Sequence, residues 1–535
     1  MLSLRAPSVF TIVLLGLVAP SFVCPVARAD EALRTWGVAE PEPVAAPPPD
    51  PPPRPPPPPE EVRQDPEAEA SAIVRAPGKI GLRYVLEGVE IRGNTTTLSR
   101  VVMRYIPFRP GDTLDVDDRE LELTRFRLLG TGYFRTVDLS LRKGSRRGHV
   151  VLVVTVIERN TIVVNDVWLG LSADAELGGR ARPLTAYGGL DVSETNLAGT
   201  GIVLGGATVI ADGQAGLRTR FSDPQFLRSA WTLEGQFLYA NAKDFFGNRD
   251  VLVDDPRQLT AQDYAVVRYQ RFGGLVGAGH DAGSVSTQVY LDYRLEKLDA
   301  ALPKAGSHQR GKDIEPIRYY IADGTGVLST LRGTLVHDTR DEPVLPTRGV
   351  HVVTVLDASL TPLGSDYAYA KVVTRASRWT PLPWGHVLRL EGIAGTIFGD
   401  APLFEKFFVG DFSDLLPDRA LELNFDRRPP PNFLDTVIRE TRWGDFAVRF
   451  NAEYRVPMYR GRRTTYGVDA FVSAGAFVLA DRRDITAPAR GYSGLSRVPA
   501  DLNFNLGLRI DTAAGGFTIG LSNLIGFIPV RREGN

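Results

Sequence analysis

FAVRFNAEYRVPMY, which runs from Phe446 to Tyr459, alternates with a strict period of two. One face carries the apolar series Phe446, Val448, Phe450, Ala452, Tyr454 and Val456. The opposite face carries Arg449, Asn451, Glu453 and Arg455. Successive side chains of a β-strand point to opposite faces, so this stretch predicts a strand that is apolar on one side and charged on the other. The fold depends on which solvent the apolar side meets.

The same alternation recurs through most of the chain beyond Asn160. HVLRLEGIAG (386–395) and LNFNLGLRID (502–511) repeat it, and about fifteen such segments lie between residues 160 and 527. Many are about ten residues long, which is enough to cross a bilayer when a strand is tilted. No window beyond the N-terminal segment holds 18 apolar residues, so a membrane helix is not expected.

Two further patterns favour a barrel in lipid over a soluble β-sandwich, whose strands also alternate. Aromatic side chains flank the apolar stretches, as Trp379 and Trp384 do around one turn. The expected turns alternate between short ones, such as 512–516, and long ones, such as 399–444. In lipid an open sheet edge leaves amides unpaired, so the sheet must close. We therefore predict a mainly β protein with a 16-stranded antiparallel transmembrane β-barrel over residues 160–535, because bacterial barrels are usually even-numbered; 14 strands is the alternative.

The sequence predicts a signal peptide at residues 1–29 and a linker at residues 30–80. Residues 1–29 combine a basic start, a short apolar run and the cleavage pattern Ala27-Arg28-Ala29, which predicts a secretory signal peptide. Cys24, the only cysteine, lies inside it, and lipid attachment there is an alternative. Residues 30–80 form a proline-rich linker that we expect to be extended and disordered, either a passive tether or a docking segment.

Residues 81–159 follow a different order. An alternating segment ends at Gly-Asn, and helical spacing with a threonine cap follows it. Asp115 or Asp117 is expected to cap a second helix, which Gly130 ends. Two strands joined by a basic, glycine-containing turn complete the segment. The pattern predicts a small α+β domain with the order strand, helix, helix, strand, strand.

Several motifs resemble those of the bacterial surface antigen superfamily, the BamA/TamA-type outer-membrane assembly barrels. LEGVEIRGNT, RPGDTLDVDD and TGYFRTVDLSL resemble a single POTRA domain. Barrel motifs of the family follow in order at Asn196-x-x-Gly199-x-Gly201, Asp223-Pro224-Gln225-Phe226, 338–349 and Glu453-x-Arg455-x-Pro457. The resemblance covers residues 80–535. It implies a bacterial outer-membrane location, with the POTRA domain and the N-terminal arm in the periplasm.

The motif DTRDEPVLPTRG at 338–349 resembles a periplasmic turn of this family. Its candidate residues are Asp338, Thr339, Arg340, Asp341, Pro346 and Gly349. Polar groups in such a turn bond its backbone, the prolines stiffen it, and the glycine lets the next strand start. We interpret its carboxylates as structural rather than catalytic.

The family also folds a long extracellular loop into the lumen, where a loop arginine meets an acid on the barrel wall. The matching region here is 404–431, which departs from the family motif at its second glycine. The resemblance implies a weakened lock between Arg419 and Glu453. Arg427 or Arg428 could replace Arg419, and Arg419 could equally be a solvated loop residue.

GFTIGLSNLIGF (516–527) resembles the C-terminal signal strand by which such barrels are recognised. Its outward positions are Phe517, Ile519, Leu521 and Phe527. IPVRREGN follows this segment, so it also resembles the family's penultimate strand, and the presence of a closing strand stays open.

The resemblance implies a protein that assists the insertion, assembly or translocation of other proteins. Its POTRA domain would receive unfolded outer-membrane or secreted polypeptides by β-augmentation and contact periplasmic or lipoprotein partners. A seam between the first and last strands would open laterally. The alternatives are a two-partner-type polypeptide secretion pore and a non-transporting structural barrel tethered by its proline-rich arm.

Nothing in the sequence indicates an enzyme, a cofactor or a metal site. The nucleophile elbow, P-loop and zinc-protease motifs are absent, and the six histidines show no ligand spacing. The near balance of 62 basic and 63 acidic residues gives no reason to expect nucleic acid as a partner.

Overall fold

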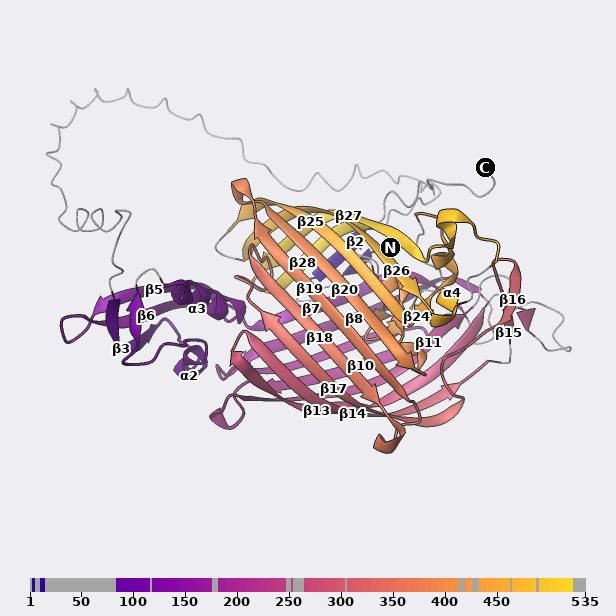
Figure 1. Ribbon diagram of the computed structural model, residues 1–535, viewed down its shortest axis with the longest axis horizontal. Helices are drawn as coiled ribbons and strands as arrows, with labels where there is room; N and C mark the ends of the chain where they lie inside the picture. Colours follow the sequence, from indigo (N-terminus) through magenta and orange to yellow (C-terminus); the bar gives the residue numbers. More distant parts are fainter. Residues whose placement is uncertain are drawn as a thin grey trace, which may run out of the picture. The chain divides into compact units, whose positions relative to one another are not determined.

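The computed structural model describes residues 2–4, 10–14, 83–115, 118–175, 181–246, 252–253, 264–303, 306–412, 419–425, 433–461, 464–486 and 490–522. Beyond two short N-terminal strands, these residues form a small α+β domain and a large sheet rolled into a barrel (Figure 1). The predicted linker and three predicted site residues, Arg427, Arg428 and Phe527, lie outside the described residues.

The α+β domain has the predicted order, with one additional short strand. Its elements are β3 Arg83–Arg92, α2 Ser99–Met103, β4 Thr113–Asp115, α3 Arg119–Gly130, β5 Phe134–Lys143 and β6 His149–Glu158. The four strands pair in the order β4-β3-β6-β5, so β5 is an edge strand. Buried Leu86, Val102, Leu128 and Leu152 belong to one apolar core between sheet and helices.

The helix ends of this domain differ in part from the sequence prediction. α3 is capped by Asp118, whose side chain accepts a hydrogen bond from the Glu120 amide, rather than by Asp115 or Asp117. The first helix has Leu98 at its N-cap and no side-chain cap. Gly130 ends α3 as predicted. Capping depends on the local turn of the chain, which alternation does not reveal.

The barrel wall contains fifteen antiparallel strands within the described residues. They are β7 Ile162–Ala175, β8 Ala181–Leu197, β9 Ile202–Ala211, β10 Gln214–Asp223, β11 Trp231–Phe246, β13 Ala265–Ser284, β14 Thr287–Ala301, β17 Gly324–Asp338, β18 Gly349–Ser359, β19 Tyr369–Pro381, β20 Val387–Gly399, β25 Phe446–Arg460, β26 Thr465–Ala480, β27 Ala500–Thr512 and β28 Gly515–Ser522. Each pairs with the next, from β7 to β28. The predicted sixteenth strand stays a prediction, since residues 523–535 lie outside the described part.

Two short N-terminal strands also join this sheet. β1 Leu2–Leu4 pairs antiparallel with β2 Phe10–Leu14, and β2 pairs in parallel with β28. Both strands lie within residues 1–29, which the sequence predicts to be removed as a signal peptide, and this removal stays a prediction.

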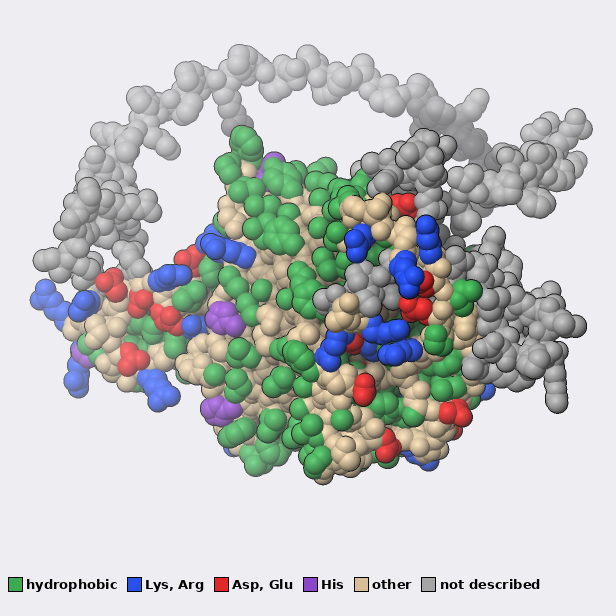
Figure 2. Space-filling model, turned by 45° about the vertical axis from the view of Figure 1, so that its right-hand side comes forward, with side chains coloured by type: hydrophobic (Ala, Val, Ile, Leu, Met, Phe, Trp, Pro, Cys, Tyr) green, Lys and Arg blue, Asp and Glu red, His purple; other side chains and the backbone are tan. Residues whose placement is uncertain are grey.

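Burial along the wall is the reverse of that in a water-soluble protein. On β14, Asp292 is 3% exposed, whereas its neighbour Leu291 is 64% exposed. On β25, the same contrast separates Asn451 at 1% from Phe450 at 54%. Figure 2 shows apolar side chains spread over the barrel wall. The faces predicted from the alternation are therefore confirmed, with polar groups inside and apolar groups outside.

A connecting segment folds into the lumen and packs against the wall. An apolar cluster there joins wall residues such as Tyr269 and Leu328 to Phe404, Phe408 and Leu423 of the segment between β20 and β25. The short elements of the connections are η1 Phe226–Arg228, β12 Leu252–Val253, β15 Gly306–Arg310, β16 Asp313–Pro316, η2 Thr361–Leu363, η3 Pro383–Gly385, η4 Leu403–Glu405, β21 Phe407–Phe408, η5 Val409–Phe412, β22 Arg419–Ala420, β23 Leu423–Asn424, η6 Val437–Glu440, β24 Trp443–Gly444, α4 Arg482–Thr486 and η7 Gly494–Arg497. None of the described helices is long and apolar enough to cross a membrane.

Candidate functional site

The first and last barrel strands meet at a seam that carries no strand ladder within the described residues. The Val164 amide donates a hydrogen bond of 2.9 Å to the carbonyl oxygen of Ala514, just before β28. Beside it, Asn160 Nδ2 donates to the Ala513 oxygen at 2.8 Å, and Arg159 forms an ion pair of 3.0 Å with Asp511. A few polar contacts therefore fasten β7 to β28 at one end of the two strands, and β2 of the predicted signal peptide pairs with the edge of β28 over Phe517–Gly520.

The 338–349 turn is held together by hydrogen bonds and an ion pair among its own polar residues. Arg340 pairs with Asp338 at 2.6 Å. Asp341 accepts hydrogen bonds from the Thr347 amide at 2.8 Å and from the Arg348 amide at 3.2 Å. Gly349 has a φ of +110°, and a Cβ there would lie 2.3 Å from the Thr339 oxygen, so the position requires glycine.

The apolar tip of this turn reaches both sides of the seam. Val344 and Leu345 are buried, and they pack against Val164 and Val167 of the first strand and Phe517 of the last. We call Val344 and Leu345 the apolar tip. Contacts of this kind stabilise by excluding water and need no fixed direction, so the tip can hold the two strands together where no ladder does.

The opposite side of the turn is fastened to the wall. Arg455 of β25 is 1% exposed, and its guanidinium donates a hydrogen bond to the Pro346 oxygen. Glu342 lies among Asp511, Asp341 and Arg159; burial and the two neighbouring carboxylates raise its pKa to about 7. Protonation of Glu342 therefore falls within the physiological pH range.

Inside the lumen, two acids of the folded-in segment pair with basic side chains of the wall. Glu405 accepts a hydrogen bond of 2.7 Å from Arg294 of β14, and Lys371 of β19 donates to the Glu405 backbone oxygen at 2.7 Å. Glu422 pairs with Arg271 of β13. Both arginines also pair with Glu296 of the wall, at 2.8 and 2.6 Å. We call Glu405 and Glu422 with Arg271 and Arg294 the lumen lock.

The expected pair between Arg419 and Glu453 is not formed in this structure. Arg419 donates to the backbone oxygens of Phe404 and Lys406 at 3.4 Å and lies over the Phe408 ring. Glu453 is on the lumen wall as expected, but its partners are other wall arginines. These partners are Arg509 at 2.5 Å, Arg389 at 3.7 Å and Arg455 at 3.7 Å. The negative charge of Glu453 is already balanced by these wall arginines, so it offers little attraction to an arginine of the loop.

The segment that resembles a C-terminal signal strand forms β28 as far as the structure describes it, and its role as a signal stays a prediction. Phe517, Ile519 and Leu521 alternate with Thr518, which is 1% exposed. Within the described residues, no group of three or more His, Cys, Asp and Glu side chains is arranged to hold a metal ion.

The described residues thus define an antiparallel β-barrel with a segment folded into its lumen and a seam without a ladder. Residues 196–416 match the Omp85 superfamily domain. The resemblance found in the sequence motifs is therefore confirmed for the part of the barrel that this match covers.

The solved structures to which this chain is similar include BamA and CdiB. BamA from Haemophilus ducreyi lacking POTRA domains 1–3 matches 84% of this chain and 82% of its own, at 15% identity and a TM-score of 0.45. CdiB from Escherichia coli matches 82% of this chain and 73% of its own, at 11% identity and a TM-score of 0.49. CdiB from Acinetobacter baumannii matches 82% and 74%, at 10% identity and a TM-score of 0.44.

Proposed function

We propose that this protein assists the insertion, assembly or translocation of other polypeptides at the outer membrane, and that β7 and β28 separate during this work. The α+β domain acts as a POTRA domain in the periplasm, and its edge strand β5 receives clients by β-augmentation. The observation that carries the proposal is the seam. β7 and β28 share only a few polar contacts and the apolar tip, whereas every other neighbouring pair of wall strands has its own ladder; the short pairing of β2 with β28 comes from the predicted signal peptide.

Exchange of backbone hydrogen bonds needs no cofactor. In lipid, an unpaired strand edge costs several kcal/mol for each unsatisfied group, so an opened seam favours pairing with an incoming strand. The unpaired N–H and C=O groups along β7 and β28 then destabilise the open barrel and offer a client strand a backbone to pair with.

A disulfide across the seam tests this proposal. Val164→Cys with Ala514→Cys would join the two sides next to the hydrogen bond that links them. The control pair, Val336→Cys with Val353→Cys, joins two facing positions of the β17–β18 ladder. We expect the oxidised seam pair, but not the control pair, to stop the acceleration of client-barrel folding in liposomes, with activity restored by reduction. Equal activity of both oxidised proteins would refute lateral opening.

The lumen lock favours a second candidate, a polypeptide secretion pore. Four charged side chains hold the segment that folds into the lumen, so breaking these pairs would release the segment from the wall. Loss of the lock would then raise ion conductance in planar bilayers and leave client-barrel folding unchanged.

A further inference from the structure

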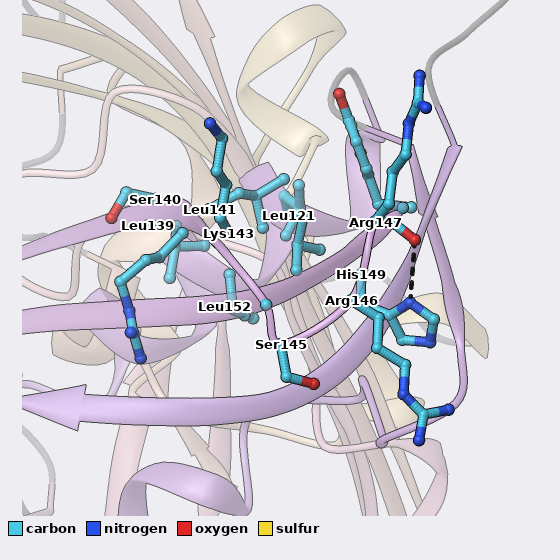
Figure 3. A pocket seen from close by; sticks show the side chains of 15 residues that line it. Leu121, Leu139, Ser140, Leu141, Lys143, Ser145, Arg146, Arg147, His149 and Leu152 are labelled. Atoms are coloured by element: carbon cyan, nitrogen blue, oxygen red, sulfur yellow. Dashed lines mark hydrogen bonds between the residues drawn. The ribbon is translucent and has the colours of Figure 1, made fainter.

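The α+β domain carries a hollow whose rim is strongly basic. A space of about 740 Å³ lies at the turn between β5 and β6. Figure 3 shows its lining, with Lys143, Arg146 and Arg147 extending from the turn and Leu121, Leu139, Leu141 and Leu152 gathered beside them. Nothing in the function proposed above uses this charge.

The floor of the hollow is apolar and half accessible. Leu139 and Leu141 of β5, Leu121 of α3 and Tyr84 of β3 are partly buried against the domain core. They leave apolar surface that another side chain can cover. Since Leu139 and Leu141 lie two apart on the edge strand, they match the side-chain spacing of an extended peptide laid beside it.

The cations of the rim are largely uncompensated. Lys143, Arg146 and Arg147 are exposed, and they form no ion pair with any residue that the structure describes. Arg142 is the exception, since it pairs with Glu90 at 2.7 Å.

One acid, Glu87, also faces the turn. Its carboxylate accepts a hydrogen bond of 2.6 Å from the Ser145 amide, and this bond lowers the pKa of Glu87. Glu87 is thus committed to the turn backbone and leaves the outer rim positively charged.

We propose that this hollow, which we call the basic groove, binds an extended acidic segment of a partner polypeptide. The segment would pair with the edge of β5 along Leu139–Lys143, beyond the Val137 oxygen that accepts a hydrogen bond from Arg125. It would place apolar side chains on the floor and point carboxylates at Arg146 and Arg147. The inference rests on the proposed function, which it deepens by naming the chemistry of the polypeptide received. A polypeptide fits better than a lipid surface, because only an extended backbone can use the open edge of β5.

The test is peptide binding to the full chain in detergent micelles. The probes are three fluorescent ten-residue peptides that alternate valine with glutamate, lysine or serine. We expect the glutamate peptide to bind about tenfold more tightly than the lysine peptide at low salt, with the difference shrinking as salt screens the charges. Arg146→Glu combined with Arg147→Glu should remove this preference. Arg109→Glu, an exposed change on the same domain outside the groove, should keep it.

Several results would overturn the inference. If all three peptides bind equally and the double charge reversal changes nothing, the domain receives clients without selecting their charge, and the inference is wrong. Binding of vesicles rich in anionic lipid through Arg146 and Arg147, with no peptide binding, would identify a membrane contact instead. Binding of no probe at all would also refute it. Folding of client barrels, measured on the same variants, separates these outcomes from failure of the proposed function.

Discussion

The seam and the β17–β18 hairpin are built from the same kind of strand but are held by different forces. β17 and β18 face each other from Thr330–Ser359 to Asp338–His351 in an unbroken ladder. β7 and β28 share no ladder within the described residues, and the apolar tip of the 338–349 turn touches both. The hydrogen bonds of a ladder are directional, and their contributions add up along a strand. The apolar tip, by contrast, holds the seam through one small contact without a fixed direction. A barrel can thus be rigid around most of its wall and still separate at one line.

The largest effect is expected where the lumen charges are reversed. Arg294→Glu would place a third carboxylate beside Glu296 and Glu405, and breaking a buried ion pair costs about 3–5 kcal/mol. We expect a clear loss of heat resistance on gels. Lys312→Glu, on an exposed turn, should have little effect, and adding Glu405→Arg to Arg294→Glu should restore part of the loss. Unchanged heat resistance of Arg294→Glu would show that the lock contributes nothing.

Shortening the apolar tip should weaken the seam without weakening the hairpin. Leu345 is 3% exposed, and Leu→Ala changes at buried sites cost about 2–5 kcal/mol. Amide hydrogen exchange of β7 and β28 should accelerate at least about tenfold in Leu345→Ala, while exchange within β17 and β18 changes little. Leu495→Ala, at a position that is 57% exposed, is the control. Uniform acceleration around the whole barrel would mean that the tip has no special relation to the seam.

The pH dependence of the seam should follow Glu342. Its pKa is raised from 4.5 to about 7, so the folded turn favours the protonated form. The stabilisation is complete below pH 4.5 and is lost as the pH rises through about 7. We expect β7 and β28 to exchange faster at pH 8 than at pH 5.5, after correction for intrinsic exchange, and Glu342→Gln to remove most of this difference. An identical pH profile in the variant would contradict the assignment.

The smallest effect is expected for direct coupling between Arg419 and Glu453. Glu453 pairs with three wall arginines, Arg509, Arg389 and Arg455. Removing the Glu453 carboxylate should therefore destabilise the wall by the same amount whether or not Arg419 is present. A double-mutant cycle with Arg419→Ala and Glu453→Gln should give a coupling energy below about 0.5 kcal/mol. A coupling of about 1 kcal/mol or more would restore the lock inferred from the family resemblance.

The alternation of the sequence predicted the wall well because a strand's faces are a local property. The exposed Phe450 and the buried Asn451 are adjacent in the chain, so a period of two places them without any knowledge of their neighbours. The order of helices and strands in the α+β domain was predictable for the same reason. The number of strands was not settled in this way, since closure depends on residues at the two ends of the sheet.

The contacts of the candidate site escaped prediction because they join distant positions. Arg294 and Glu405 lie 111 residues apart, and no periodicity connects them. The apolar tip did leave a signal in the sequence. Val344 and Leu345 are two adjacent apolar residues between prolines, in a turn that is otherwise polar. Two adjacent apolar side chains in an otherwise polar turn indicate that this part of the turn packs against another part of the protein.

In the lumen lock the acids lie on the segment and the arginines on the wall, which is the reverse of the loop-arginine and wall-acid pair that the resemblance implies. This arrangement has a consequence for permeation. If the segment between β20 and β25 withdraws, it removes the Glu405 and Glu422 carboxylates and leaves Arg271, Arg294 and Lys371 on the wall with Glu296. The wall around the lock would then carry excess positive charge, which favours chloride over potassium at this place in the passage. A reversal potential indicating cation preference across a salt gradient, with the segment displaced, would contradict this expectation.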